Sequence, residues 1–320
     1  MPPTDPASLK VGSESYTRHL EEEIRHYTEV FTAIPEADPA AGTGYQPVPE
    51  VWRTLEKRAE RVIRDRTGNN LIGHVIARLD RIPRVDLISL GAGACGIELS
   101  FARRVRSAAI TCVDINATLL EQARAKAQAE DLEMHFETAD LNTLELPASA
   151  HDIVFCHAAL HHVIELEHLF EQIRRTLRPD GELIVVDVIT PNGYRMRPAT
   201  RTVVNTLWSA IPPRFRINHT AYPEPRLDLQ VCEPDTSTTS MECIRSEDIL
   251  PLLNATFTSR HFVPFYSISR RFFDTMYGPN YELTNHLDRA IFEFIWELDQ
   301  HYIATGELEP ETFFGIYGLS

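Results

Sequence analysis

A group of glycines and one aspartate has the residue types and spacing of a nucleotide site. Gly91, Gly93 and Gly96 directly follow an apolar run, in the segment GAGACG. Glycines in such a place let the chain turn tightly and bring backbone N–H groups against a ligand, and the next helix N-terminus can bind an anion. Asp114 ends the next apolar run, about 20 residues farther on, where a carboxylate can accept both ribose hydroxyls of an adenosine. These four residues predict a site for an adenosine-containing cofactor.

Three histidines follow a later apolar run and could do acid–base chemistry. His157, His161 and His162 stand in the segment HDIVFCHAALHHV. An imidazole with an ordinary pKa near 6.5 suits a general base that removes a proton from a hydroxyl or ammonium group. The alternative is that this segment is a packing turn. No H-E-x-x-H or Cys/His ligand spacing occurs, so we expect no metal site.

The elements that must position these residues alternate between strand and helix. Apolar runs at 85–90, 109–114, 134–140, 152–157 and 182–188 predict strands, and amphipathic stretches at 96–106, 117–129 and 166–177 predict helices. Short apolar strands without strict alternation are typical of a parallel sheet covered by helices on both faces. In such a doubly wound α/β fold, ligands bind beyond the carboxyl ends of the strands, which is where the glycines, Asp114 and the histidines fall.

The flanking segments differ from this core. Helices are expected at 13–33, 50–66 and 69–80, with a Pro/Gly/Ala break at 35–48, followed later by a proline-rich lid at 190–245, a short helix capped by Ser246, a strand at 260–268, a helix at 284–304 and a strand at 312–318. We therefore divide the chain into a helical lead-in (1–83), a nucleotide-binding core (84–189), a lid insertion (190–250) and a C-terminal completion of the sheet (251–320).

The helix expected at 284–304 has an amphipathic pattern. Its apolar positions recur at spacings of three and four and predict one buried face. They are Leu287, Ile291, Phe294, Ile295, Leu298 and Tyr302. That face could pack inside the molecule or form a homodimer surface.

The core resembles a known family. Over about residues 85–190 the chain resembles the class I methyltransferases that use S-adenosylmethionine. The segments that carry this resemblance are the glycine loop, 138–147, 151–163 and 177–188 with its Pro-Asp-Gly turn. The resemblance implies a Rossmann-like, doubly wound seven-stranded sheet whose last strand, here 312–318, is antiparallel. It also implies a glycine loop under the methionine part of the cofactor, Asp114 on the ribose, and Asp140 on the adenine amino group with Leu141 flanking it.

The resemblance completes the set of site residues. Two positions depart from the family pattern: Ser89 stands where many relatives have an acidic residue, and Cys95 replaces a glycine. The segment SLGAG, followed by Glu98, is similar to the corresponding segment of a methyltransferase subgroup that acts on small molecules and glycans. The cofactor site is assigned to Ser89, Gly91, Gly93, Asp114, Ile115, Asp140, Leu141, Cys156 and His157. The catalytic candidates are His157, His161 and His162.

Arginines and aromatic residues of the lid could bind the acceptor. They could hold a carboxylate or phosphate group, or stack on a ring or sugar face, while the alternative for each is an ordinary solvated arginine beside core aromatics. The arginines are Arg195, Arg197, Arg201, Arg214 and Arg216, and the aromatic residues are Tyr194, Trp208 and Tyr222.

Composition excludes several classes of protein. The 320 residues carry 31 basic and 46 acidic side chains, a net charge of −15. This charge would repel nucleic acid and anionic lipid, so neither is expected as a partner. No apolar stretch has the length of a membrane span, and the odd number of cysteines, 5, fits a reduced cytoplasmic setting.

Three hypotheses follow for function. The first is transfer of a methyl group from S-adenosylmethionine to a hydroxyl or amine of a small molecule. The second is an NAD-dependent oxidoreductase, because Gly91-x-Gly93-x-x-Gly96 with Asp114 also fits a dinucleotide fingerprint. The third is a protein that binds S-adenosylmethionine without transferring methyl, which the departures at Ser89 and Cys95 allow.

Overall fold

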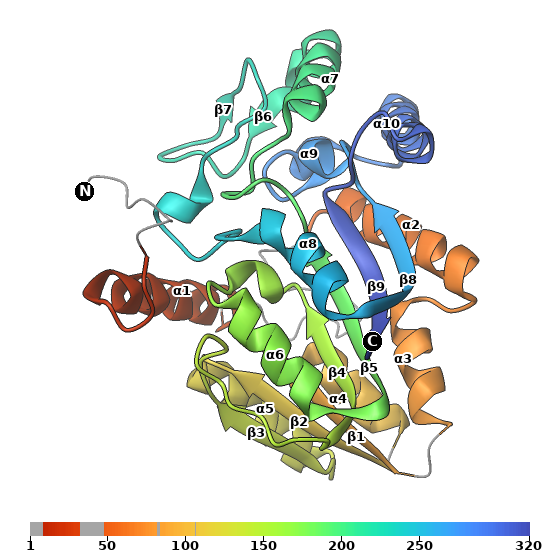
Figure 1. Ribbon diagram of the computed structural model, residues 1–320. Helices are drawn as coiled ribbons and strands as arrows, with labels where there is room; N and C mark the ends of the chain where they lie inside the picture. The colour runs from red at the N-terminus through yellow and green to blue at the C-terminus, as the bar shows by residue number, and fades with distance from the viewer. Residues whose placement is uncertain (1–8, 33–47, 82–83, 106) are drawn as a thin grey trace.

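A seven-stranded sheet forms the centre of the computed structural model, which describes residues 9–32, 48–81, 84–105 and 107–320 (Figure 1). The strand order is β3-β2-β1-β4-β5-β9-β8. The strands are β1 (Val85–Leu90), β2 (Ala108–Asp114), β3 (Met134–Thr138), β4 (His151–His157), β5 (Leu177–Val188), β8 (Thr258–Phe265) and β9 (Thr312–Gly318). A separate two-stranded ribbon pairs β6 (Ile217–Asn218) with β7 (Arg226–Leu227).

The strand directions confirm the expected sheet. Strands β1 to β5 pair in parallel, and β9 pairs antiparallel with both β5 and β8. Val188 at the end of β5 pairs with Thr312 at the start of β9. The carboxyl ends of the parallel strands and the beginning of β9 therefore meet at one edge of the sheet.

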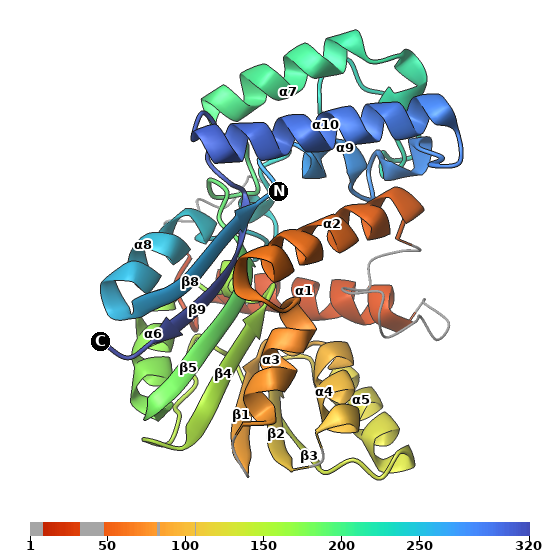
Figure 2. The same cartoon turned by 90° about the vertical axis from the view of Figure 1, so that its right-hand side faces the viewer.

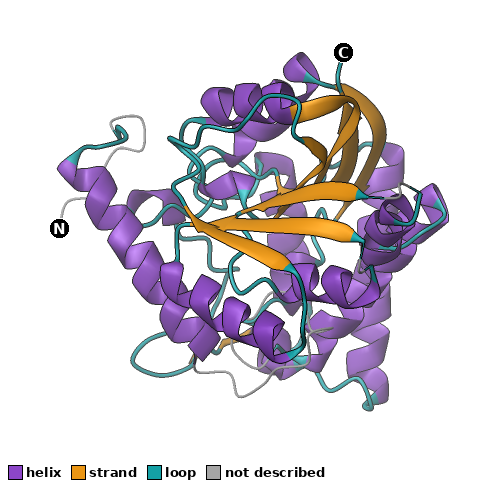
Figure 3. Cartoon of the chain, turned by 90° about the horizontal axis from the view of Figure 1, so that it is seen from below, coloured by secondary structure: helices purple, strands orange, loops and turns teal. Residues whose placement is uncertain are grey.

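Helices cover both faces of this sheet, as a parallel sheet requires (Figures 2 and 3). On one face Phe101 and Phe155 meet edge to face, with ring centroids 5.6 Å apart. On the other face Phe170 and Ile173 belong to a second core cluster together with Leu253. The covering helices are α3 (Leu71–Leu79), α4 (Gly96–Arg104) and α5 (Ala117–Ala129) on the first face, and α6 (Leu166–Thr176) and α8 (Ser246–Thr256) on the second.

A helical cap lies beyond the edge to which the parallel strands point (Figure 2). Its core is aromatic: Trp208 and Tyr277 are fully buried and their rings lie 4.6 Å apart. The cap contains α7 (Pro198–Ala210), α9 (Arg270–Phe273) and α10 (His286–Thr305), next to α2 (Glu50–Thr67). The remaining long helix, α1 (Glu14–Thr32), crosses the same end of the sheet (Figure 1).

Four short 3₁₀ turns complete the secondary structure of the described residues. They are η2 (Leu160–His162), η3 (Pro213–Arg216), η4 (Thr236–Thr238) and η5 (Gly278–Asn280).

The lid segment is more regular than its proline content suggests, because it contains α7. Pro198 stands at the first position of this helix, where no backbone N–H is needed, and Pro212 and Pro213 follow its end. Prolines therefore delimit a helix here rather than prevent one.

Two local predictions were wrong. Ser246 does not cap α8, since its hydroxyl donates to the carbonyl of Thr190, and the N-cap position belongs to Arg245. The strand predicted at 260–268 ends at Phe265, because Tyr266 takes a left-handed conformation with φ of 57°. The next three backbone N–H groups then donate to one oxygen of Asp299.

The buried face predicted for α10 was also partly wrong. Phe294 and Leu287 are 59% and 49% exposed, whereas Asp288 and Asp299 are buried. Asp288 pairs with Arg214, and Asp299 accepts the backbone N–H groups of a turn. A carboxylate with such partners is as well satisfied in the interior as an apolar side chain, which the apolar periodicity does not reveal.

Several predictions stay open. The break at 35–48 lies, except for residue 48, outside the described residues. The division of the chain at 83, 189 and 250 stays a prediction. Within the described ranges, no helix combines the length and apolar character needed to cross a bilayer.

Candidate active site

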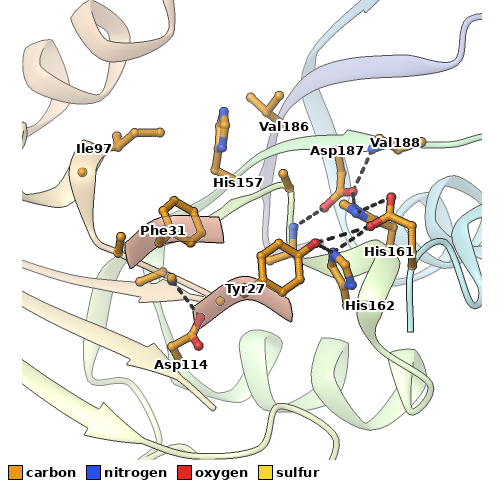
Figure 4. A pocket seen from close by; sticks show the side chains of 18 of the residues that line it. Tyr27, Phe31, Ile97, Asp114, His157, His161, His162, Val186, Asp187 and Val188 are labelled. Carbon is orange, nitrogen blue, oxygen red and sulfur yellow. Dashed lines mark hydrogen bonds and ion pairs between the residues drawn. The ribbon is translucent and has the colours of Figure 1, made fainter. Parts of the chain in front are cut away.

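A large pocket opens at the edge of the sheet where β1, β2, β4 and β5 end (Figure 4). Its volume is about 1680 Å³. Side chains from α1 and the cap line its other sides, and Tyr27 of α1 lies beside His162 (Figure 4). The structure brings most of the predicted site residues together in its wall. They are Gly91, Gly93, Asp114, Ile115, Asp140, Leu141, His157, His161 and His162.

The turn between β1 and α4 needs glycine at two positions. Gly91 has φ of 71°, and a Cβ there would lie 2.5 Å from the Cβ of Ala159. Gly93 has φ of 52°, and a Cβ there would meet no atom within 4 Å. The backbone of Gly93 therefore lies open to the pocket, which fits the close approach of a ligand to a glycine loop.

Asp114 fixes this turn and keeps capacity for a ligand. One carboxylate oxygen accepts the N–H of Gly93 at 2.7 Å, and the other accepts the N–H of Asn116 at 2.8 Å. An ionised carboxylate has about four acceptor sites, so two remain for hydroxyl groups. Burial raises the pKa of Asp114, while the two backbone N–H groups favour its charged form.

Ser89 and Cys156 lie inside the fold. Ser89 is buried and its hydroxyl donates to Glu98 at 2.7 Å, and it is Glu98 that lines the pocket. Burial raises the pKa of Glu98 to about 7. Cys156 is fully buried in the core beneath α6. Glu98 of helix α4 therefore places a carboxyl group beside Ser89, the position at which many relatives have an acidic residue.

Asp140 is held by α1. The hydroxyl of Tyr16 donates to one oxygen of Asp140 at 2.5 Å, and the amide of Asn142 donates to the other at 3.0 Å. Asn142 also accepts the N–H groups of Ile164 and Glu165, so it joins this loop to the start of α6. The Tyr16 contact could not be predicted from a local pattern, because 124 residues separate the two partners.

The histidines after β4 have different environments. His161 donates from Nδ1 to Asp187 at 2.5 Å, and its Nε2 lies 3.6 Å from Glu242. Although burial disfavours the charge, these two carboxylates raise the pKa of His161 to about 10. His157 also lines the pocket (Figure 4), and burial lowers its pKa to about 4. At neutral pH His161 is therefore an imidazolium and His157 a neutral imidazole.

His162 lies between two carboxylates and a tyrosine. Its Nδ1 is 3.2 Å from Glu23, and its Nε2 is 3.6 Å from Glu242. The hydroxyl of Tyr27 lies 3.3 Å from the same Nε2 (Figure 4). Two of these partners come from α1, so the helix completes the surroundings of the histidine. No sequence pattern predicted these long-range contacts.

The described residues include one group with metal-ligand geometry. The ligand atoms of His161, Glu242 and Cys243 lie within 4.8 Å of one another. His161 is protonated at neutral pH and so has no lone pair for a metal. Burial also raises the pKa of the Cys243 thiol well above its usual value. A cation could bind this group only by displacing the protons of the His161 ring and the Cys243 thiol.

The lid arginines expected to hold an acceptor anion mostly have protein partners. Arg201 pairs with Glu233 at 2.7 Å, Arg197 with Glu309 at 2.9 Å, and Arg195 with Asp235 at 3.7 Å. Arg214 pairs with Asp288. Arg270, which the sequence did not single out, is an arginine that lines the pocket.

Comparison with known proteins finds relatives for the core. A family model described as "Methyltransferase domain" matches residues 88–185. A 2-phytyl-1,4-naphtoquinone methyltransferase of Trichormus variabilis is 28% identical over 145 residues, 44% of this chain and 63% of that protein. An uncharacterized methyltransferase of Mycobacterium bovis is 36% identical over 107 residues, 33% of this chain and 52% of that protein.

Longer relatives match only in part. A hybrid PKS-NRPS synthetase of Fusarium is 29% identical over 137 residues, 40% of this chain and 3% of that protein. The chain thus spans less than two thirds of the length of the curated relatives it matches. Among solved structures, the PH0226 protein of Pyrococcus horikoshii has a TM-score of 0.47 and 13% identity, covering 91% of this chain and 99% of that one.

The family match and the site coincide. Residues 88–185 contain the glycine loop, Asp114, Asp140 and the three histidines, and the sheet has the expected antiparallel strand between β5 and β8. Residues 88–185 are therefore a methyltransferase domain with the class I fold, whose cofactor is S-adenosylmethionine.

Proposed function

We propose that this protein transfers the methyl group of S-adenosylmethionine to a hydroxyl or amine of a small molecule bound in the same pocket. The observation that carries the proposal is the pairing of an open glycine turn with Asp114, whose carboxylate has acceptor capacity to spare. The pocket volume of about 1680 Å³ exceeds the roughly 300–1,000 Å³ usual for one ligand. It has room for a cofactor and an acceptor together.

Each part of the cofactor has residues that fit it. Asp114 would accept the ribose hydroxyls, and the backbone at Gly93 would lie against the methionine part. Asp140 and Leu141 would flank the adenine, as the resemblance implies. When bound, S-adenosylmethionine supplies a methyl group on a positively charged sulfur, which an acceptor can attack directly.

The protein's own groups would align the acceptor and receive its proton. His157, neutral at pH 7, can accept a hydrogen bond from an acceptor hydroxyl. His162 is our choice of general base, because its ring lies in the pocket with Nδ1 3.2 Å from Glu23 and Nε2 3.6 Å from Glu242, contacts that orient it. His161 is already protonated and serves as a positioning residue that holds Glu242.

The oxidoreductase hypothesis has less support. The dinucleotide-binding fold consists of two parallel halves in the order 3-2-1-4-5-6. Here an antiparallel strand, β9, lies between β5 and β8, which breaks the symmetry of the second half.

Calorimetric titration with S-adenosylmethionine, S-adenosylhomocysteine and NADH tests the cofactor. We expect micromolar binding of the first two and none of NADH, and NADH binding alone would overturn the proposal. Methyl transfer is then tested with radiolabelled S-adenosylmethionine and a panel of small alcohols, phenols and amines. Tight cofactor binding without any labelled product would instead support a binding protein that does not transfer methyl.

A further inference from the structure

One arginine of the pocket lacks the partner that its charge requires. Arg270, at the start of α9, lines the pocket, and its Nε is buried without a hydrogen-bond partner. Among the described residues its guanidinium group forms no ion pair, although the more distant charge of Glu242 attracts it. Its guanidinium carbon lies over the rings of Tyr194 and Trp52, 5.1 and 5.3 Å from their centroids.

The neighbouring residue shows what a satisfied arginine looks like at this place. Arg271 is buried, and it pairs with both oxygens of Glu311 at 2.8 and 2.9 Å. It donates in addition to the carbonyl of Tyr194 at 3.0 Å. The fold therefore supplies hydrogen-bond and ion-pair partners to Arg271, whereas Arg270 faces the pocket.

The carboxylates around Arg270 are engaged with other donors. Glu56 accepts the indole N–H of Trp52 at 2.8 Å, and Asp274 accepts the backbone N–H of Met276 at 2.9 Å. Glu242 lies against His161 and His162. These groups give the region negative charge without forming an ion pair with the guanidinium.

The same carboxylates restrict the anion that would fit. Burial raises the pKa of Glu56 to about 7 and that of Asp274 to about 6, so both keep part of their charge at neutral pH. Their repulsion acts more strongly on a doubly charged phosphate than on a singly charged carboxylate. A carboxylate also matches the planar fork of a guanidinium with two parallel hydrogen bonds.

We infer that Arg270 binds a carboxylate of the acceptor, whose apolar part lies against Trp52 and Tyr194. This inference rests on the proposed function, because it assigns the acceptor half of that pocket. It gives the acceptor a chemical class: a small carboxylic acid with a hydroxyl or amine that reaches the side of the pocket near His157 and His162.

Matched ligand pairs test this inference without knowledge of the natural acceptor. The protein, saturated with S-adenosylhomocysteine, is titrated with benzoate, cinnamate, indole-3-acetate and hexanoate, and with the neutral carboxamide of each. Phenyl phosphate serves as the doubly charged probe. We expect at least one carboxylate to bind tenfold or more tightly than its amide, and more tightly than phenyl phosphate.

The substitution Arg270→Gln should abolish this preference for carboxylates. Arg195→Gln is the matched control, because Arg195 belongs to the lid but pairs with Asp235, and it should keep the wild-type preference. A carboxylate preference that survives Arg270→Gln, or the lack of a preference in every pair, would overturn the inference. Tighter binding of phenyl phosphate would overturn the choice of a carboxylate.

Cofactor affinity separates the two proposals. Arg270→Gln should bind S-adenosylhomocysteine as the wild type does, because Arg270 lies on the cap side of the pocket. If the wild type bound no S-adenosylhomocysteine, the proposed function would fail, and the carboxylate titrations would still be run on the protein alone.

Discussion

His161 and Asp187 form a buried pair in which Nδ1 of the imidazolium donates to the carboxylate at 2.5 Å. The other oxygen of Asp187 accepts the backbone N–H groups of Ala159 and Leu160 at 3.0 and 2.8 Å. A residue at the end of β5 thus holds the whole turn that follows β4. The positions of His161 and His162 depend on this one carboxylate, whereas His157 belongs to β4 itself.

Replacement of that carboxylate should release His161. Asp187→Asn keeps the size of the side chain but removes the charge, so we expect the pKa of His161 to fall by at least one unit from about 10. Methyl transfer should fall with it, because the turn loses its anchor. Histidine resonances followed by NMR against pH measure the pKa. Asp152→Asn, at the opposite end of the sheet, is the control and should leave His161 unchanged.

Loss of the Asp114 carboxylate should weaken cofactor binding. Asp114→Ala removes charge-assisted hydrogen bonds, whose loss usually costs about 1–3 kcal/mol, or roughly a 5- to 150-fold increase in Kd. Calorimetry with S-adenosylhomocysteine measures the change. Asp65→Ala, at an exposed position of α2, provides the comparison. An unchanged Kd in Asp114→Ala would contradict the assignment of the site.

The two glycines of the turn should respond differently to alanine. Gly91→Ala would place a Cβ 2.5 Å from Ala159, so we expect a protein destabilised by more than about 2 kcal/mol. Gly93→Ala meets open space and incurs only the left-handed backbone strain of about 1 kcal/mol. Its main effect should be weaker cofactor binding. Thermal unfolding and calorimetry of both variants test the contrast, and equal losses of stability would contradict it.

The contact between α1 and the core should depend on Tyr16. Tyr16→Phe removes the hydrogen bond to Asp140 and should loosen α1, with a loss of about 1–2 kcal/mol because the carboxylate loses a hydrogen-bond donor. Hydrogen exchange along α1 measures this local opening. Tyr302→Phe on α10 is the matched control. Equal protection of α1 in Tyr16→Phe and the wild type would show that the hydroxyl does not anchor the helix.

Glu98 should make stability depend on pH. Its pKa rises from 4.5 to about 7 on burial, so between these values the folded state holds a proton that the unfolded state has lost. Stability therefore falls as the pH rises from 4.5 to 7, by about 3 kcal/mol at most.

Glu98→Gln should remove this dependence. The variant should match the wild type near pH 4.5 and exceed it in unfolding free energy at pH 8. Denaturant unfolding at both pH values measures the difference. Glu121→Gln, on the exposed side of α5, should show no such gain, and a wild type that is as stable as Glu98→Gln at pH 8 would refute the prediction.

The alternation of apolar runs was enough to predict the sheet. Parallel strands are buried on both faces, so each is a short continuous apolar segment, and the turns between them carry the glycines and carboxylates of the site. Gly91, Gly93 and Asp114 could be found for this reason, because each lies at or just after the end of a strand. The prediction was less accurate for α10, where the buried Asp288 and Asp299 broke the apolar pattern.

The partners of these residues were decided by the tertiary structure alone. Tyr16 meets Asp140 across 124 residues, and Glu242 meets His161 across 81, because α1 and the lid fold back over the end of the sheet. The protonation of His161 follows from its contacts with Asp187 and Glu242. Local patterns record the period of a strand or helix, whereas the charge on a side chain depends on groups that only the complete fold brings within a few ångströms.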